Sequence, residues 1–189
     1  MPELYDGLIL YHGSYCEVPT PLLDKCAARK DFGRGFYLTT SRDQAISFLR
    51  TSIIKAANKG DADRNQQYGF LSEFRVQKSE HLKIYSFQTA DTDWLHCVAA
   101  HRKRNSFIEM EKKMAEYDVI IGKIADDQTN AVLTAYISGV FGRMGEPETD
   151  AFCIRQLYPD KLKDQFCFKT EAAIASLHFV KGEQVWIQK

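Results

Sequence analysis

The chain has 189 residues, 44% of them hydrophobic and 26% charged, proportions that are ordinary for a globular protein and predict a single domain over residues 1–189. Its 25 Lys and Arg residues balance its 25 Asp and Glu residues, which argues against a dedicated nucleic-acid binder or a membrane-surface protein but is compatible with a local basic patch. Five scattered cysteines form no Cys-x-x-Cys pair, which argues against a disulfide framework or a zinc motif. The first residues are acidic and no apolar stretch is long enough to span a bilayer, so we expect a cytoplasmic protein with reduced thiols and no membrane partner.

In the first third of the chain, a strand, a loop, a second strand and a helix are predicted. An apolar run at residues 8–11 predicts a buried strand that ends in His12-Gly13-Ser14, and an irregular loop follows it. Beyond a short glycine-containing loop, residues 36–39 have the composition of a strand. Residues 41–57 then predict a helix that begins with a serine cap.

Two aromatic residues of this unit stand eleven positions apart, Tyr37 in the predicted strand and Phe48 in the predicted helix. Flat rings on adjoining elements can hold a flat ligand ring between them. The alternative is that both rings belong to the hydrophobic core, where aromatic side chains are often found. Both interpretations are compatible with this stretch.

Further along the chain, strand and helix patterns alternate irregularly. Strands are predicted at residues 68–76, 82–87, 117–122, 162–169 and 179–187. Helices are predicted from Asp91 or Thr92 through His101, over residues 131–140, after Thr149 and after Thr170. Asp126 and Asp127 precede the second of these helices, as acids favoured at a helix N-terminus. Because strands and helices do not alternate strictly, the sequence predicts an α+β fold rather than a doubly wound sheet.

His96 and His101 stand five residues apart, with Cys97 beside them, a grouping that can suggest a metal site. Five positions on a helix turn two side chains about 140° apart, whereas ligands on one face need a spacing of three or four. We therefore expect a packed or solvent-edge histidine pair and no metal. The sequence also lacks the Gly-x-Ser-x-Gly, P-loop and His-Glu-x-x-His motifs of other enzyme classes.

Three separated motifs give the chain a family resemblance that covers roughly residues 8–179. They are Tyr11-His12-Gly13-Ser14, then Gly35-Phe36-Tyr37-Leu38-Thr39 with Phe48 beyond it, and Asp164-Gln165-Phe166-Cys167-Phe168. In this order they are similar to the ADP-ribosyltransferase superfamily, in the branch of diphtheria-type toxins and poly(ADP-ribose) polymerases, whose motif is His, Tyr, Glu on three strands. With residues 31–39 and 117–122, they resemble more closely the bacterial DUF3990 family, which is commonly placed with toxin–antitoxin modules. The resemblance implies two packed, mostly antiparallel sheets with surrounding helices and a central NAD cleft.

The resemblance also implies a role in NAD binding for each matching residue. His12 is expected to bond the ribose on the adenosine side, and the Gly13 backbone to hold the nicotinamide carboxamide. Tyr37 and Phe48 are expected to stack on the two faces of the nicotinamide ring. Gln165 is expected to contact the 2′-hydroxyl of the nicotinamide ribose, so the implied catalytic set is His12, Tyr37 and Gln165.

Two further residues of this region, Thr39 and Arg34, complete the expected NAD-binding set. Arg34 lies with Arg29 and Lys30 beside the glycines of the second motif, where basic side chains can neutralise the NAD diphosphate. The alternative is a basic loop that is simply solvated.

Gln165 departs from the superfamily motif, which has a glutamate at this place. A carboxylate stabilises the positive charge that develops on the ribose as the glycosidic bond breaks, whereas an amide can only accept a hydrogen bond. Asp164 is expected on the other face of the strand, and Glu171 in the next helix, so neither compensates.

The expected activity is therefore the transfer of single ADP-ribose units from NAD to a macromolecule, a protein or a nucleic acid. The resemblance also implies a toxin that is held in check by a cognate antitoxin. The alternatives are an NAD glycohydrolase, in which water is the acceptor, and a non-catalytic module that binds NAD or ADP-ribose.

Overall fold

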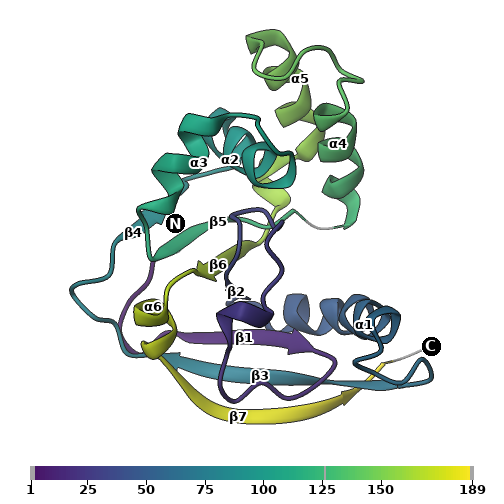
Figure 1. Ribbon diagram of the computed structural model, residues 1–189, viewed down its shortest axis with the longest axis vertical. Coiled ribbons are helices and arrows are strands. Elements are labelled where there is room, and N and C mark those ends of the chain that lie inside the picture. Colours follow the sequence, from purple (N-terminus) through teal and green to yellow (C-terminus); the bar gives the residue numbers. More distant parts are fainter. Residues whose placement is uncertain (1–2, 126, 188–189) are drawn as a thin grey trace.

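The computed structural model describes residues 3–125 and 127–187, and this part of the chain forms an α+β fold with two β-sheets. One sheet is the bottom layer of Figure 1, the second lies above it, and helices α2 to α5 lie above the second sheet. Helix α1 lies beside the lower sheet, and the loop between the first two strands rises in front of the second sheet toward the upper helices.

The two sheets differ in size and in strand direction. The first contains three antiparallel strands in the order β1 (Ile9–Ser14), β3 (Tyr68–Val76) and β7 (Leu177–Trp186). The second contains four strands in the order β2 (Phe36–Leu38), β6 (Asp164–Phe168), β5 (Val119–Lys123) and β4 (Ile84–Ser86). All neighbours are antiparallel except β4 and β5, which are parallel.

Six α-helices and two short 3₁₀ turns connect the described strands. The helices are α1 (Arg42–Lys59), α2 (Thr92–Arg102), α3 (Ile108–Ala115), α4 (Asp127–Ile137), α5 (Pro147–Leu157) and α6 (Glu171–Ala175). The 3₁₀ turns are Leu23–Lys25 and Pro159–Lys161. Within residues 3–125 and 127–187, no helix has both the length and the apolar character needed to cross a bilayer.

A backbone bridge joins the two sheets where β1 passes the end of β2. The N–H of Tyr11 donates to the carbonyl of Thr39 over 2.8 Å, and the N–H of Thr39 donates back over 3.0 Å. Between the sheets lies an apolar core that includes the buried side chains of Leu10, Phe74 and Phe166. Burying each such side chain stabilises the fold by about 2 kcal/mol.

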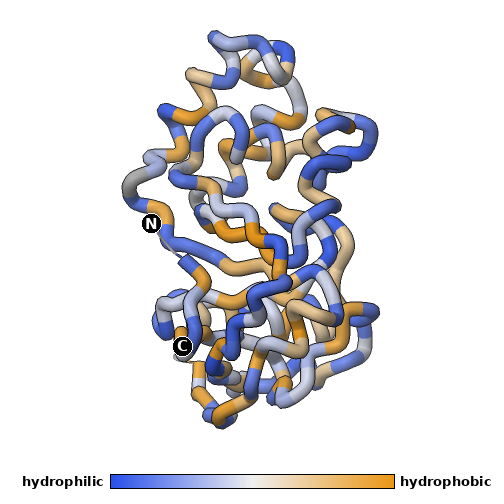
Figure 2. Tube along the Cα trace, turned by 90° about the vertical axis from the view of Figure 1, so that its left-hand side faces the viewer, coloured by the Kyte–Doolittle hydropathy of each residue, from blue (hydrophilic) through white to orange (hydrophobic). Residues whose placement is uncertain are grey.

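A second core lies on the opposite face of the second sheet, under the upper helices. It includes the fully buried Trp94, Tyr136 and Cys167. Figure 2 shows orange hydrophobic segments crossing the middle of the molecule, where the second sheet separates the two cores. Because neighbouring strand residues alternate faces, Phe166 faces the first core while Gln165 and Cys167 face the second.

Most of the predicted elements are confirmed, and strand β1 ends in His12-Gly13-Ser14 as predicted. Helix α4 covers Asp127–Ile137 rather than residues 131–140, so Asp127 lies within the helix and not before it. Helix α5 begins at Pro147 rather than after Thr149, since proline is favoured in the first turn of a helix. Helix α3 has no counterpart among the predicted elements, and the predicted cap Asp126 lies outside the described residues.

Candidate functional site

His12 lies on β1 with its imidazole against Phe36, the two ring centres 4.3 Å apart. Its Nδ1 lies 2.8 Å from the backbone carbonyl oxygen of Tyr37. Because a carbonyl only accepts hydrogen bonds, Nδ1 carries the hydrogen of the neutral ring, and Nε2 is the acceptor. Desolvation lowers the pKa of His12 to about 4, against the opposing hydrogen bond to Tyr37 and with a contribution from the charge of Lys30, so the ring is neutral at pH 7.

Strands β1 and β2 part immediately after the bridge between Tyr11 and Thr39. Continued antiparallel register would place Gly13 opposite Tyr37, but the imidazole of His12 binds the Tyr37 carbonyl instead. The described backbone forms no hydrogen bond between Gly13 and Tyr37. Alternate residues of a strand direct their polar groups to the same side, so the Gly13 N–H and C=O face the β2 side as those of Tyr11 do. This adjacent donor and acceptor are complementary to a primary amide.

Gly13 and Thr39 also stabilise the position of α1 relative to β1 and β2. A Cβ atom added at Gly13 would lie 1.9 Å from the carbonyl oxygen of Ala45, so only glycine lets the helix approach β1 this closely. The Thr39 hydroxyl is buried and accepts the Ser41 N–H over 3.1 Å. Ser41 in turn caps α1 by accepting the N–H of Gln44 over 3.3 Å, as predicted.

The phenol of Tyr37 is held by the loop that precedes β2. Its hydroxyl donates to the carbonyl of Gly33 over 2.8 Å and accepts the N–H of Phe32 over 2.9 Å. Burial raises the pKa of Tyr37 well above its ordinary value, so the hydroxyl remains a donor at neutral pH. The ring of Phe32 lies nearly parallel to that of Tyr37, with centres 6.5 Å apart.

Gln165 lies on β6 diagonally across from Tyr37, on the same face of the second sheet. The register pairs Tyr37 with Cys167, and Gln165 is two residues from Cys167. The Gln165 side chain is buried, and its Nε2 donates to Asp31 Oδ2 over 2.9 Å and to the Lys123 carbonyl over 3.1 Å. Residues 31–33 therefore bond the polar ends of both Tyr37 and Gln165.

Asp31 and Arg102 are two residues of this site that the sequence analysis did not identify. Asp31 Oδ1 accepts from Arg102 Nη2 over 2.6 Å and from Arg102 Nε over 3.0 Å, while its Oδ2 accepts from Gln165. Asp31 is the first residue of the segment 31–39, which contributed to the family resemblance, so the sequence did contain a signal for Asp31. Arg102 ends α2, 71 residues away, and no local pattern relates it to Asp31.

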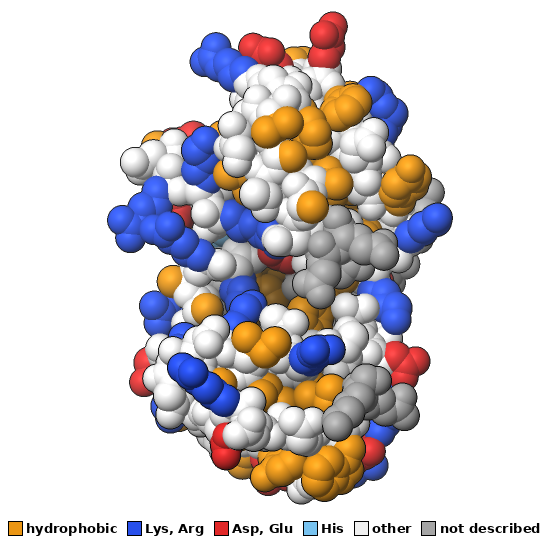
Figure 3. All heavy atoms as spheres, turned by 90° about the vertical axis from the view of Figure 1, so that its right-hand side faces the viewer, with side chains coloured by type: hydrophobic (Ala, Val, Ile, Leu, Met, Phe, Trp, Pro, Cys, Tyr) orange, Lys and Arg blue, Asp and Glu red, His pale blue; other side chains and the backbone are white. Residues whose placement is uncertain are grey.

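Positive charge gathers around the Asp31 carboxylate. Lys30 precedes it, and desolvation together with the charge of Lys55 lowers the pKa of the Lys30 ammonium. Arg102 supplies a third cation within the same group. Figure 3 shows a face of the molecule that is hollowed between its upper and lower parts, with Lys and Arg side chains among those around the hollow. The charges of this region favour an anionic ligand.

Two predicted NAD-binding residues stand apart from this cluster. Phe48 is half-buried on α1, and in the described structure its ring makes no contact with that of Tyr37. Arg34 is exposed, and its Nη1 donates to the backbone carbonyl of Asp24 over 3.2 Å. Whether Tyr37 and Phe48 hold a ring between them stays a prediction.

His96 and His101 have separate partners, in line with their spacing on α2. His96 Nε2 lies 2.6 Å from Asp150 Oδ2, and its ring stacks on Phe107 with centres 4.0 Å apart. His101 Nδ1 donates to the Cys97 carbonyl over 2.8 Å, and its ring lies against Gly33. Gly33 has a φ of +84°, and a Cβ there would lie 2.7 Å from His101, so this turn under the loop needs glycine. Among the residues that the structure describes, no group of His, Cys, Asp and Glu is arranged to hold a metal.

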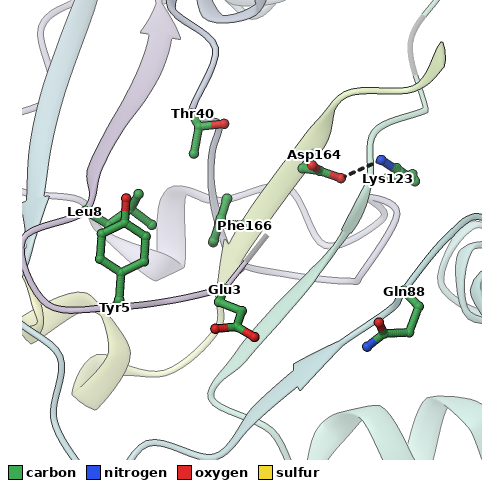
Figure 4. Close-up of a pocket in the computed structure, with 8 residues that line it drawn as sticks. All are labelled: Glu3, Tyr5, Leu8, Thr40, Gln88, Lys123, Asp164 and Phe166. Atoms are coloured by element: carbon green, nitrogen blue, oxygen red, sulfur yellow. Dashed lines mark ion pairs between the residues drawn. The ribbon is translucent and has the colours of Figure 1, made fainter. Parts of the chain in front are cut away.

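A pocket of about 400 Å³ opens where β5 ends and β6 begins, on the side of the second sheet that faces the first sheet. Figure 4 shows it, with Lys123 Nζ and Asp164 Oδ1 paired at 3.0 Å in its wall. Asp164 therefore points away from Gln165, as predicted, and none of the predicted NAD-binding residues lines this pocket. The lining residues are Glu3, Tyr5, Leu8, Thr40, Gln88, Lys123, Asp164 and Phe166.

The fold and the site define an α+β protein in which the three motif residues come from β1, β2 and β6 of two joined sheets. A family model described as "Protein of unknown function (DUF3990)" matches residues 8–179, so the chain belongs to the DUF3990 family. This confirms the family expectation, and the relationship to ADP-ribosyltransferases stays a prediction. No curated protein matches the chain.

Proposed function

We propose that this protein transfers single ADP-ribose units from NAD to a macromolecular acceptor. The observation that carries the proposal is the parting of β1 and β2 around His12. It leaves the Gly13 N–H and C=O directed toward the β2 side, beside the strand that carries Tyr37. A nicotinamide carboxamide is a primary amide, and it can bond to both groups at once.

The protonation state of His12 supports the same ligand. The hydrogen bond from Nδ1 to Tyr37 and the low pKa of the ring make Nε2 an acceptor at neutral pH. A ribose hydroxyl can donate to such an acceptor, whereas a phosphate oxygen cannot. His12 is therefore suited to a sugar rather than to the diphosphate of NAD.

A dinucleotide also needs positive charge near its diphosphate, and we assign this role to the cations around Asp31. Lys30, Lys55 and Arg102 contribute three positive charges against the one negative charge of Asp31. Burial is the main cause of the lowered pKa of Lys30, and the repulsive charges of Lys55 and Arg102 lower it further. A diphosphate in this region would relieve that repulsion, and we assign it there.

The proposed reaction breaks the bond between C1′ of the nicotinamide ribose and the ring nitrogen. The bonding electron pair goes to nicotinamide, which leaves as a neutral molecule, and the ribose carbon develops oxocarbenium character. A nucleophile of the acceptor then bonds to C1′ and loses its proton to solvent. Gln165 provides an amide rather than a carboxylate near the ribose, which is consistent with transfer of single units rather than synthesis of a polymer.

The test compares three variants by nicotinamide release and by binding of labelled NAD. His12→Asn keeps a donor near the Tyr37 carbonyl but removes the Nε2 acceptor, and His12→Ala removes both. We expect both to weaken NAD binding about tenfold, the effect of one lost hydrogen bond in a buried site, while His12→Asn unfolds near the wild-type temperature. His81→Asn, a change at an exposed histidine, is the matched control.

The products separate the alternatives. Label that enters the protein or nucleic-acid fraction of a bacterial extract supports transfer, whereas free ADP-ribose in equal amount to nicotinamide indicates a glycohydrolase. Binding without release indicates a non-catalytic module. A wild-type protein that neither binds nor cleaves NAD overturns the proposal. Slowed growth on expression without an antitoxin, relieved by His12→Asn, tests the expected toxicity.

A further inference from the structure

The amide of Gln165 has one orientation that its surroundings permit. Nε2 lies 2.9 Å from a carboxylate oxygen of Asp31 and 3.1 Å from the carbonyl oxygen of Lys123. Both of these neighbours only accept, so the NH₂ group must face them, and an amide turned by 180° would set three oxygens against one another. Both hydrogens of Nε2 are then used inside the protein. The carbonyl oxygen is the group that Gln165 can offer to a ligand.

Asp31 is itself fixed, which makes it able to hold the amide. Its side chain is 9% exposed, and the guanidinium of Arg102 grips Oδ1 through two nitrogens, at 2.6 and 3.0 Å. The two charge-assisted bonds from Arg102 hold Oδ1 in place, and the bond from Gln165 engages Oδ2, so both oxygens of the carboxylate are held. The arrangement therefore runs as a chain from Arg102 on α2, through Asp31 in the loop, to Gln165 on β6.

We propose that Asp31 is the positioning residue of this site, which turns the Gln165 carbonyl oxygen toward the nicotinamide ribose. This role rests on the proposed function. It explains how an amide can occupy the place of the superfamily glutamate, because the oriented carbonyl presents an acceptor to the ribose 2′-hydroxyl as a carboxylate does. The negative charge of Asp31 stays one hydrogen bond behind that acceptor, where it strengthens the carbonyl as an acceptor by polarising the amide.

The same contacts would destabilise a carboxylate at position 165, because both neighbouring groups are hydrogen-bond acceptors. In Gln165→Glu, one oxygen would stand near Asp31 Oδ2 and the Lys123 carbonyl, at about the distances of the present Nε2. The pair can be accommodated by sharing one proton, which raises the pKa of the introduced carboxyl. Arg102 donates to Asp31 Oδ1, on the other oxygen of that carboxylate, and the Ala125 N–H donates to Asp31 Oδ2 at 3.4 Å, so neither bonds to position 165 in the present arrangement.

The first experiment tests the orientation of the Gln165 side-chain amide and needs no NAD. We measure thermal unfolding of Gln165→Glu and of Asp31→Asn/Gln165→Glu between pH 5 and pH 8. The introduced carboxyl has a folded-state pKa above its unfolded value, so the folded state holds the extra proton and loses stability as pH rises through that pKa. We expect Gln165→Glu to unfold at least about 4 °C further below wild type at pH 8 than at pH 5, and the double variant to lose this difference.

The second experiment reads the positioning role through NAD cleavage at equal folded concentration. Asp31→Asn should lower kcat about tenfold while changing KM less than about threefold, because the lost alignment matters as the bond breaks. The double variant should have a higher kcat than either single variant, since an asparagine can donate to the introduced carboxylate. Asp164→Asn, on the same strand but the opposite face, is the matched control and should leave kcat unchanged.

The outcomes separate this proposal from the proposed function. Equal pH dependence for wild type and Gln165→Glu overturns the orientation, and an unchanged kcat in Asp31→Asn overturns the positioning role. A wild type without NAD cleavage overturns the proposed function, and only the orientation is then decided by the first experiment. If Gln165→Glu does not fold, the wild-type side-chain amide signal of Gln165 decides instead. Protection of that NH₂ group from hydrogen exchange supports the orientation, and free exchange overturns it.

Discussion

The buried carboxylates of Asp31 and Asp150 accept hydrogen bonds in two different parts of the molecule and from two different kinds of donor. Asp31 connects the loop before β2 with α2 and β6, and its partners are the guanidinium of Arg102 and the amide of Gln165. Asp150 lies on α5 among the upper helices. It accepts from the Tyr136 hydroxyl over 2.5 Å and from the Gly145 N–H over 3.1 Å on Oδ1, and it pairs with His96 on Oδ2.

The difference separates a structural acid from the acid to which we assign a positioning role. The partners of Asp150 belong to α2, α4 and the turn before α5, so their hydrogen bonds hold the upper helices together. The ring of His96 also stacks on Phe107 in that layer. Asp31, in contrast, bonds the motif residue Gln165 and lies among the cations Lys30, Lys55 and Arg102. A buried carboxylate is thus informative about function through the residues that it bonds rather than through its burial.

The largest expected effect is on the Asp150 side of this comparison. Asp150→Ala leaves the Tyr136 hydroxyl and the Gly145 N–H without their buried acceptor, so the free energy of unfolding should fall by about 4 kcal/mol. Denaturant unfolding measures this, with Glu148→Ala, an exposed acid on the same helix, as the control that changes stability by less than about 0.5 kcal/mol.

NAD cleavage by the folded fraction of Asp150→Ala should stay at the wild-type value. A lowered kcat in a variant that keeps its stability would break the comparison, because Asp150 would then act at the site and not only in the helical layer.

The fold followed from local patterns where the pattern is strong. Alternation along β6 correctly predicted that Asp164 and Gln165 lie on opposite faces, because neighbouring residues of a strand point to opposite sides. The start of α5 was missed because Thr149 has the chemistry of a cap, whereas the structure buries it inside the helix and starts the helix at Pro147. Capping preference is a local signal, and burial of Thr149 is decided by packing.

The site followed from sequence only as far as the motif residues. His12 and Tyr37 were expected together, and they are joined by a hydrogen bond between a side chain and a backbone carbonyl. The contacts of Asp31 with Arg102 and Gln165 span 71 and 134 residues, and they arise only when the loop, α2 and β6 meet. The acid beside Gln165 is therefore Asp31, and no local pattern in the sequence encodes that contact.

An intermediate effect is expected from His12 when the pH is lowered. Its pKa falls from the ordinary value of 6.5 to about 4 on folding, so the unfolded chain binds more protons between these values. Stability should therefore fall as pH drops from 6.5 to 4, by about 2 to 3 kcal/mol for this group. His12→Asn should flatten this part of the profile of unfolding free energy against pH. A His12→Asn profile as steep as that of wild type would assign the slope to other groups.

The smallest expected effect concerns Arg34, at the edge of the Asp31 region. Its side chain is exposed and bonds only to the Asp24 carbonyl among the contacts described, so Arg34→Ala should change the free energy of unfolding by less than about 0.5 kcal/mol. If Arg34 contributes to the diphosphate site as predicted, the variant should raise KM for NAD about threefold at low salt, and less at high salt because exposed charges are screened. Lys30→Ala, within the cation group, should raise KM more than Arg34→Ala does. Equal KM values for wild type and Arg34→Ala at low salt would instead mark Arg34 as part of a solvated loop and confine the NAD-binding cations to those around Asp31.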